Sequence, residues 1–201
     1  MITISVEISG ITPLICNRFH DEAAQAASSG SRSASAAQDR GTPLEIASKK
    51  LYLGGAGGQT PIIPQPNLLR CLIDGGRFEK VGKAQVTTAA SSMLFAFLDI
   101  EAAEIEIQHQ QPWRVDTRAV VIPSTKGRVL THRPMFDDWR LAFEMRLDTG
   151  NFNAKLMRRI VDHAGSRVGL GDFRPARKGP YGRFAVVRWE ERDALDLARA
   201  A

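Results

Sequence analysis

The stretch Trp139-Arg-Leu-Ala-Phe-Glu-Met-Arg-Leu147 alternates apolar and polar residues, and this pattern predicts a strand with one buried face. Asn153 follows as the predicted N-cap of a helix that Gly165 is expected to end. The apolar residues of that helix recur at helical spacing: Leu156, Met157, Ile160 and Val161. A long glycine-rich loop from Gly165 to Gly182 then leads into a last strand, Phe184-Ala-Val-Val-Arg-Trp189.

Earlier parts of the chain complete an order of strand, helix, strand, strand, helix and strand. Residues 2–8 alternate in the same way, and this strand continues loosely over residues 11–16. Residues 64–76 predict a helix with Asn67 as its N-cap, and residues 104–108 predict another strand. This order is the split βαβ arrangement. We therefore expect an α+β, ferredoxin-like (RRM-like) fold, in which two helices cover one face of a four-stranded antiparallel sheet. The other face stays open, and RNA-recognition domains use that face.

Two insertions are expected within this single domain of residues 1–201. Residues 113–122 and 128–132 flank Pro123-Ser-Thr-Lys-Gly127 and predict a hairpin with a glycine-containing turn. Ala and Ser make up twelve of the fifteen residues 23–37, so a flexible insertion is expected over about 21–42. A polar tail, or a short helix, is expected over residues 190–201.

Positive charge is concentrated in two stretches of the chain. The formal net charge is +5, but residues 165–189 alone hold six Lys or Arg against one acid, and residues 113–133 hold five against one. Clustered basic charge is what neutralising the phosphates of a nucleic acid requires. The alternative interpretation is a solvated basic surface that has no partner.

Composition also limits the other classes of function. Two cysteines are too few for a disulfide framework, and the four histidines are scattered, so we expect no metal and no cofactor. No apolar run is long enough to span a bilayer, so no membrane partner is expected. The first residues lack the pattern of a signal peptide, so we expect a cytoplasmic protein of a bacterial or phage-infected cell.

The segment Gly169-Leu-Gly171-Asp-Phe-Arg-Pro-Ala-Arg-Lys-Gly179-Pro-Tyr-Gly182-Arg-Phe184 resembles the C-terminal glycine-rich loop of the RAMP superfamily, the RRM-like proteins of CRISPR effector complexes. Ile63-Pro64 looks like the family's turn into its first helix. The chain is most similar to the backbone subunits, so the resemblance implies RNA binding and self-association along the strand. Its Ile11-Thr-Pro-Leu14 and the start of the glycine-rich segment also resemble a group of tailed-phage and prophage proteins.

The glycine-rich loop has a physical interpretation that is independent of the family. Glycines let a backbone approach a phosphate and expose consecutive N–H groups, and interleaved basic and aromatic residues suit a strand with unpaired bases. The alternative is a basic surface loop that only connects helix to strand. The spacing of a Walker motif is missing. The predicted nucleic-acid-binding residues are Arg18, Arg118, Lys126, Arg128, Arg133, Arg167, Gly169, Gly171, Phe173, Arg174, Arg177, Lys178, Tyr181 and Arg183.

We therefore expect sequence-independent binding of single-stranded RNA or DNA, with the protein as a repeating subunit of a nucleoprotein filament. The hairpin tip Lys126-Gly-Arg128 is expected to reach over the strand or touch a neighbouring subunit, although a solvated hairpin is the alternative. No catalytic residue is predicted, because no acid/base pair is legible. Two alternatives stay open. One is an RNA endonuclease of the RAMP type that uses His20 or His132, and the other is a phage structural protein with an acidic partner.

Overall fold

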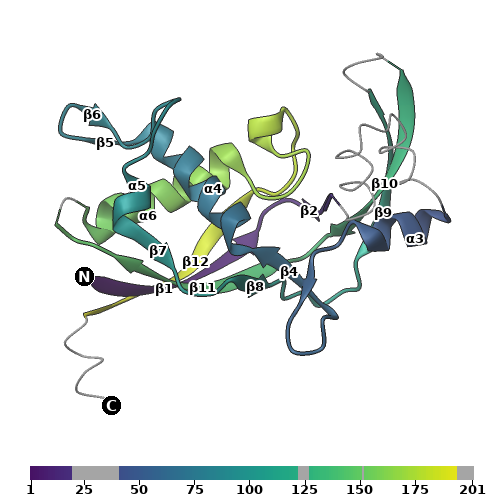
Figure 1. Cartoon of the computed structure of the whole chain (residues 1–201), viewed down its shortest axis with the longest axis horizontal. Coiled ribbons are helices and arrows are strands. Elements are labelled where there is room, and N and C mark those ends of the chain that lie inside the picture. Colours follow the sequence, from purple (N-terminus) through teal and green to yellow (C-terminus); the bar gives the residue numbers. More distant parts are fainter. Residues whose placement is uncertain (20–40, 122–126, 151, 194–201) are drawn as a thin grey trace, which may run out of the picture.

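Four strands far apart in the sequence form the largest sheet of the computed structural model (Figure 1). They are β1 (Ile2–Gly10), β7 (Leu98–Ile100), β11 (Arg140–Leu147) and β12 (Phe184–Asp193). Their order is β12-β1-β11-β7, and each strand is antiparallel to its neighbour. The structure describes residues 1–19, 41–121, 127–150 and 152–193. The chain is thus an α+β protein, as predicted, and its described part contains several antiparallel sheets.

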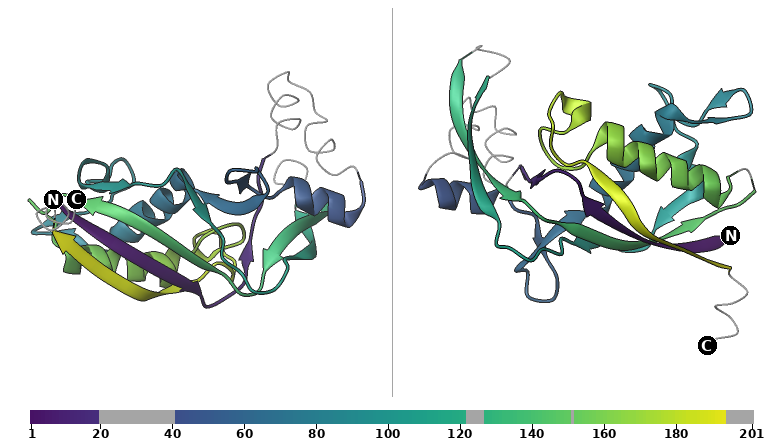
Figure 2. Two further views of the ribbon diagram at one scale, coloured as in Figure 1. Left: turned by 90° about the horizontal axis from the view of Figure 1, so that it is seen from below. Right: turned by 180° about the vertical axis from the view of Figure 1, so that it is seen from behind.

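Two helices cover one face of this sheet, α4 (Gln65–Gly75) and α6 (Ala154–His163) (Figures 1 and 2). Asn153 caps α6 as predicted, because its side chain accepts a hydrogen bond from the backbone N–H of Leu156. The apolar residues of α6 and the inward-facing residues of β1 and β11 are buried in one core. The alternating pattern of the two strands places their other residues on the face without helices, called the open sheet face below.

Three predicted boundaries are wrong, each for a local reason. Helix α4 begins at Gln65 with Pro64 at its N-cap, so Asn67 lies inside the helix. Helix α6 does not end at Gly165, because a turn of π-helix (Ala164–Val168) continues it. Gly165 is needed there for packing, since a Cβ atom would lie 2.2 Å from the carbonyl oxygen of Phe184. The predicted tail also begins too early, because β12 includes the residues as far as Asp193, and residues 194–201 lie outside the described residues.

The strand predicted over residues 104–108 exists, but it belongs to a second sheet. It is β8 (Glu104–Glu106), and it pairs with β4 (Thr60–Pro64), which also pairs with β3 (Leu53–Gly54). Its expected place in the main sheet is taken by β7, whose three residues are too few to show an alternating pattern. Other short elements are β5 (Lys80–Val81), β6 (Ala84–Gln85), α5 (Leu94–Phe97) and two turns of 3-10 helix, Gly76–Phe78 and Pro175–Arg177.

The predicted hairpin is present and extends away from the main sheet (Figure 2). It consists of β9 (Arg114–Val121) and β10 (Arg128–Phe136), and the end of β10 pairs with β2 (Leu14–Ile15). Helix α3 (Pro43–Lys49) packs against it. The turn of the hairpin and most of the Ala/Ser-rich insertion lie outside the described residues. Within the described part of the chain, no helix combines the length and apolar character needed to cross a membrane.

Candidate nucleic-acid interface

The glycine-rich loop, residues 169–183, folds back onto the segment around β2. The backbone N–H of Asp172 donates to the carbonyl oxygen of Ile15 at 2.7 Å, and the N–H of Leu170 donates to that of Gly182 at 2.9 Å. Gly171 and Gly182 both have positive φ, 73° and 70°. A Cβ atom at Gly171 would lie 2.4 Å from the Ile15 oxygen, and one at Gly182 would lie 1.8 Å from the Leu170 oxygen. These glycines therefore let the loop pass close to its own chain.

The turn of the same loop is closed by its own hydrogen bonds. The N–H groups of Gly179 and Tyr181 donate to the carbonyl oxygens of Arg174 and Phe173, at 3.0 and 3.3 Å. A Cβ atom at Gly179 would lie 1.8 Å from the Phe173 oxygen, and Lys178 has a positive φ of 61°. The expectation that the loop offers consecutive N–H groups to a phosphate is therefore wrong for these amides, because they are already donated inside the protein.

Arg133 fastens the hairpin to the loop from a buried position, with 4% of its surface exposed. One terminal nitrogen lies 3.0 Å from a carboxylate oxygen of Asp116 on β9, and the other lies 2.8 Å from Asp172 in the loop. Asn17 donates to the same oxygen of Asp172 at 3.0 Å. Arg133 was predicted to contact nucleic acid. The structure corrects this, because its charge is enclosed between two carboxylates and does not reach the surface.

Arg118 and Tyr181 contact each other beside this buried ion pair. The Arg118 Nε atom donates to Asp116 at 2.6 Å, and this bond raises the pKa of Arg118 above its ordinary value. The guanidinium also bonds to the Tyr181 hydroxyl and lies 4.6 Å from the centre of that ring. Phe173 contacts the same ring at a centroid distance of 6.0 Å. One face of Tyr181 is therefore already covered by a cation.

Five basic residues of this region, called the loop cations below, have no carboxylate partner within the described part of the chain. Arg174 and Arg183 each donate only to a backbone carbonyl, of Gly171 at 2.8 Å and of Ser166 at 2.9 Å. Arg167 lies over the ring of Phe78, 4.7 Å from its centre. The exposed side chains of the other two reach solvent. The loop cations are Arg167, Arg174, Arg177, Lys178 and Arg183.

The open sheet face differs, because each of its arginines is paired. Arg140 lies 3.2 Å from Glu7, Arg146 lies 2.7 Å from Asp99, and Arg188 lies 2.8 Å from Glu190. Arg192 pairs with Glu144. A hydrogen bond from Arg188 holds the pKa of Glu190 below its ordinary value. The pKa of Glu144 is also lowered, first by a hydrogen bond from Ser5 and then by the charge of Arg192.

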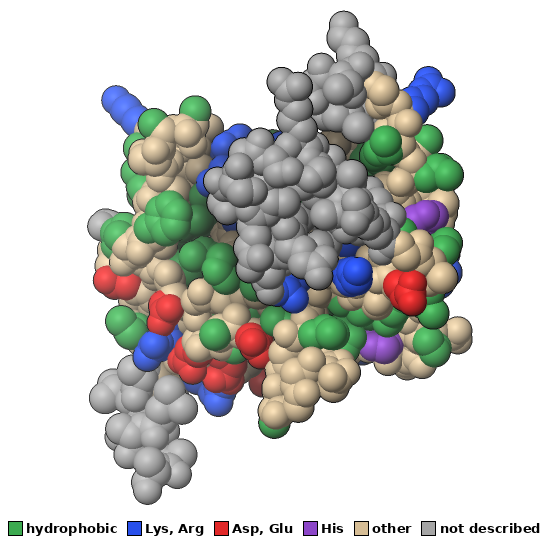
Figure 3. Space-filling view, turned by 45° about the vertical axis from the view of Figure 1, so that its right-hand side comes forward, with side chains coloured by type: hydrophobic (Ala, Val, Ile, Leu, Met, Phe, Trp, Pro, Cys, Tyr) green, Lys and Arg blue, Asp and Glu red, His purple; other side chains and the backbone are tan. Residues whose placement is uncertain are grey.

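Two aromatic side chains of the main sheet, one on β11 and one on β12, point away from the open sheet face. Phe143 is buried in the core, and Trp189 contacts Arg158 of α6, so both lie on the helix side. RNA-recognition domains stack bases on aromatic residues of the open face. The described strands of this protein offer charged and small residues there instead. On the face shown in Figure 3, acidic side chains lie mainly in the lower half.

The remaining predicted residues are scattered around the hairpin. Arg128 is exposed at the start of β10, and Arg18 is half-buried, with its N–H donating to the carbonyl oxygen of Lys50 at 2.9 Å. Lys126 and His20 lie outside the described residues. The Nδ1 atom of His132 lies 2.8 Å from the Thr117 hydroxyl. Over the described ranges, no three His, Cys, Asp or Glu side chains come together in a way that could hold a metal ion.

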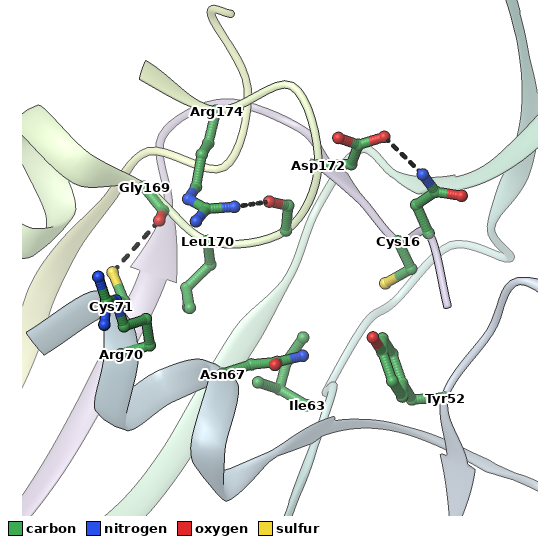
Figure 4. Close-up of a pocket in the computed structure, with 12 residues that line it drawn as sticks. Cys16, Tyr52, Ile63, Asn67, Arg70, Cys71, Gly169, Leu170, Asp172 and Arg174 are labelled. Atoms are coloured by element: carbon green, nitrogen blue, oxygen red, sulfur yellow. Dashed lines mark hydrogen bonds between the residues drawn. The ribbon is translucent and has the colours of Figure 1, made fainter. Parts of the chain in front are cut away.

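Sequence reasoning missed a cavity of about 220 Å³ beneath the loop (Figure 4). Its walls include Tyr52, Asn67 and Arg70, which come from segments that are distant from the loop in sequence. Asn67 was assigned to a cap, and a single Tyr or Arg carries no pattern. The packing of α4 and of the segment between α3 and β3 under the loop brings these residues together.

Comparison with known proteins supports the fold. No family model and no curated protein matches the chain. A chain in the cryo-EM structure of the type III-B Cmr-beta bound to cognate target RNA matches with a TM-score of 0.55 and 10% identity. The match covers 94% of this chain and 60% of that chain, so this chain spans less than two thirds of its length. A chain of a type IV-B CRISPR complex matches with a TM-score of 0.48, 14% identity, and coverage of 92% and 90%. The first of these matches shows that this chain shares its fold with a chain of the type III-B Cmr-beta structure.

Proposed function

We propose that this protein binds single-stranded RNA or DNA, without reading its sequence, through the surface formed by the loop cations. The observation that carries the proposal is that these five side chains have no carboxylate partner in the described structure, whereas the arginines of the open sheet face are paired. Cations without carboxylate partners keep their charge available to phosphates, and neutralising phosphates releases the counterions of the nucleic acid.

A single strand is proposed rather than a duplex because aromatic residues lie among the cations. Phe173 and Tyr181 are both half-buried in the loop, next to Arg174 and Lys178. Stacking on such side chains needs unpaired bases, and it tolerates any base because every base has a flat face. The hairpin beside the loop, fixed there by Arg133, would border the path of the strand.

The arrangement of the main sheet supports a specific fold assignment. The chain order β1, α4, β7, β11, α6, β12 and the spatial order β12-β1-β11-β7 correspond to the split βαβ topology, so we assign a ferredoxin-like, RRM-like domain. The type III-B Cmr-beta structure that shares the fold is bound to cognate target RNA. By analogy we propose a repeating subunit of a nucleoprotein filament in the cytoplasm, with a binding and not a catalytic role.

The test compares two triple variants that each remove three positive charges. Arg174→Ala, Arg177→Ala and Lys178→Ala change the loop, and Arg140→Ala, Arg188→Ala and Arg192→Ala change the open sheet face. Binding of single-stranded RNA, single-stranded DNA and duplex is measured at several salt concentrations. We expect the loop variant to bind more weakly, with a salt dependence flatter by about 2 in slope, which is about 0.7 for each lost contact. We expect the sheet-face variant to bind like the wild type.

A folded loop variant with unaltered affinity and slope would place the site elsewhere. The same samples, incubated with RNA with and without magnesium, also test catalysis. Cleavage of RNA by the wild-type protein, abolished by His132→Ala, would favour the endonuclease. Salt-independent binding, or no binding of any oligonucleotide, would favour an interaction with a protein.

A further inference from the structure

The cavity beneath the loop is built by four separate segments of the chain. Asn17 follows β2, Tyr52 lies between α3 and β3, Asn67 and Arg70 belong to α4, and Arg174 reaches down from the glycine-rich loop (Figure 4). Its volume of about 220 Å³ is below the range of about 300–1,000 Å³ that is typical of pockets for drug-sized ligands. A single ring system is therefore a suitable occupant, and a larger cofactor is too large.

Several polar groups of the cavity have unused hydrogen-bonding capacity. In the described structure the Tyr52 hydroxyl and the Asn67 amide have no hydrogen-bond partner. Asn17 donates its Nδ2 to Asp172, which leaves its Oδ1 as an acceptor. Arg174 uses one terminal nitrogen for the carbonyl oxygen of Gly171 and keeps its other donors. Donors and acceptors from opposite walls thus converge on one space.

The rest of the wall is apolar. Ile63 and Leu170 are buried, and the two thiols of the protein also line the cavity. Burial raises the pKa of Cys16 and of Cys71 to about 12, so both stay protonated and behave as small apolar groups. The Cys71 thiol donates to the carbonyl oxygen of Gly169 at 3.2 Å. An occupant therefore meets apolar surface on its faces and polar groups at its edges.

The charge balance of the cavity is positive. Its one carboxylate, that of Asp172, already accepts bonds from Arg133 and Asn17. Arg174 has no carboxylate partner in the described structure. The Nε atom of Arg70 lies 3.4 Å from a carboxylate oxygen of Asp74, and the Arg70 side chain is largely exposed. Phosphates can therefore approach these two arginines, whereas a phosphate inside the cavity would be set against Ile63 and the other apolar walls.

We propose that this cavity receives one unpaired nucleobase of the bound strand, turned out of its stack, while the phosphates beside it contact Arg70 and Arg174. This inference rests on the proposed function and assigns a site to it. Proteins that hold a base in this way bind its polar edge through hydrogen bonds and enclose its faces with apolar or aromatic side chains. Tyr52, Asn67 and Asn17 supply the first kind of contact, and Ile63 and Leu170 supply the second.

The test combines a change in the protein with a change in the ligand. Tyr52→Phe with Asn67→Ala removes a hydroxyl and an amide, and neither change disturbs the fold because Phe is isosteric and Asn67 is exposed on α4. Two single-stranded RNA decamers are compared, one with all of its bases and one abasic at every position. We expect the double variant to bind the complete decamer about tenfold more weakly, as the loss of two hydrogen bonds implies, and to bind the abasic decamer unchanged.

A matched control is Gln108→Ala, which removes an exposed amide remote from the cavity and should leave both affinities unaltered. Equal weakening on both decamers would show that the cavity contacts the backbone only, and no weakening on either would show that it holds no base. Either result overturns the inference. If the wild-type protein binds neither decamer at low salt, the proposed function itself is contradicted. If the wild-type protein binds both decamers equally, the proposed function stands and the inference about the cavity fails.

Discussion

The open sheet face and the glycine-rich loop both present arginines, and they differ in what those arginines contact. On the sheet face, Arg140, Arg188 and Arg192 each pair with a glutamate. In the loop, Arg174 and Arg183 contact only backbone carbonyl groups. A paired arginine offers little net charge to a phosphate, since its own carboxylate must first be displaced. The number of basic residues on a surface therefore locates a site less well than the number of them that have no acidic partner.

The largest effect is expected at the connection between hairpin and loop. Arg133→Met removes the buried partner of two carboxylates, because Asp116 is left with Arg118 alone and Asp172 loses its ion pair. Breaking a buried ion pair in this way costs about 3–5 kcal/mol, which for a chain of this size lowers the melting temperature by roughly 6–20 °C. Thermal unfolding is the measurement. Arg192→Met breaks an exposed pair on the sheet face and should change stability by less than about 1 kcal/mol. Equal losses would mean that Arg133 is not a structural residue.

A second effect concerns the backbone of the loop. Gly182→Ala forces a Cβ atom toward the Leu170 oxygen at a positive φ, so we expect a loss of at least about 2 kcal/mol in the free energy of unfolding, together with weaker nucleic-acid binding. Gly57→Ala is the matched control, because nothing lies within 4 Å of the place that its Cβ atom would take. Urea unfolding compares the two. A stable Gly182→Ala protein with normal affinity would show that the loop tolerates a different path.

The third prediction asks whether pairing alone distinguishes the two surfaces. Glu7→Gln, Glu144→Gln and Glu190→Gln together remove the carboxylates from three arginines of the sheet face. We expect the affinity for a long single strand to rise about threefold at low salt, and the salt dependence to become steeper, because new phosphate contacts release counterions. An unchanged salt slope would show that the loop depends on its shape as well as on its unpaired charges.

The smallest effect is a difference in acid sensitivity. The pKa of Glu144 and Glu190 in the folded protein lies below the ordinary value of 4.5, so their contribution to stability is present above that value and is lost as the pH falls through the folded pKa. Glu144→Gln with Glu190→Gln should therefore flatten the loss of stability between about pH 5 and pH 3. The triple loop variant, which removes no paired carboxylate, should keep the wild-type profile. Unfolding midpoints across this pH range provide the measurement.

Local patterns predicted the elements that bury one face. The alternation in β1 and β11 and the cap at Asn153 were each legible, because burial of one face and capping depend on nearby residues. β7 was not legible, since three residues cannot show a period. The pairing of Arg133 with Asp116 was not predicted either. It depends on the register of the hairpin, and a shift by one residue would place the two side chains on opposite faces.

The glycines of the loop illustrate a different limit. Gly171 and Gly182 were singled out for close approach to a phosphate, whereas the structure shows both in close approach to the protein's own chain. The absence of a Cβ atom permits either kind of approach, so the sequence could not distinguish them. The loop cations were named from charge density alone. Their lack of carboxylate partners in the described structure could not be read from the sequence, since acidic residues such as Asp172 lie just as near along the chain.

The two buried thiols beneath the loop allow local opening of the loop to be measured by the rate of their alkylation. Alkylating reagents attack the thiolate, and with a pKa of about 12 the buried Cys71 is almost entirely protonated at neutral pH. Alkylation of Cys71 in the native protein therefore requires Gly169 and its neighbours to move away from the thiol. The rate of alkylation then reports how often that local opening occurs, with no label added to the chain. Any molecule that holds the loop in place slows the reaction by the factor by which it suppresses opening.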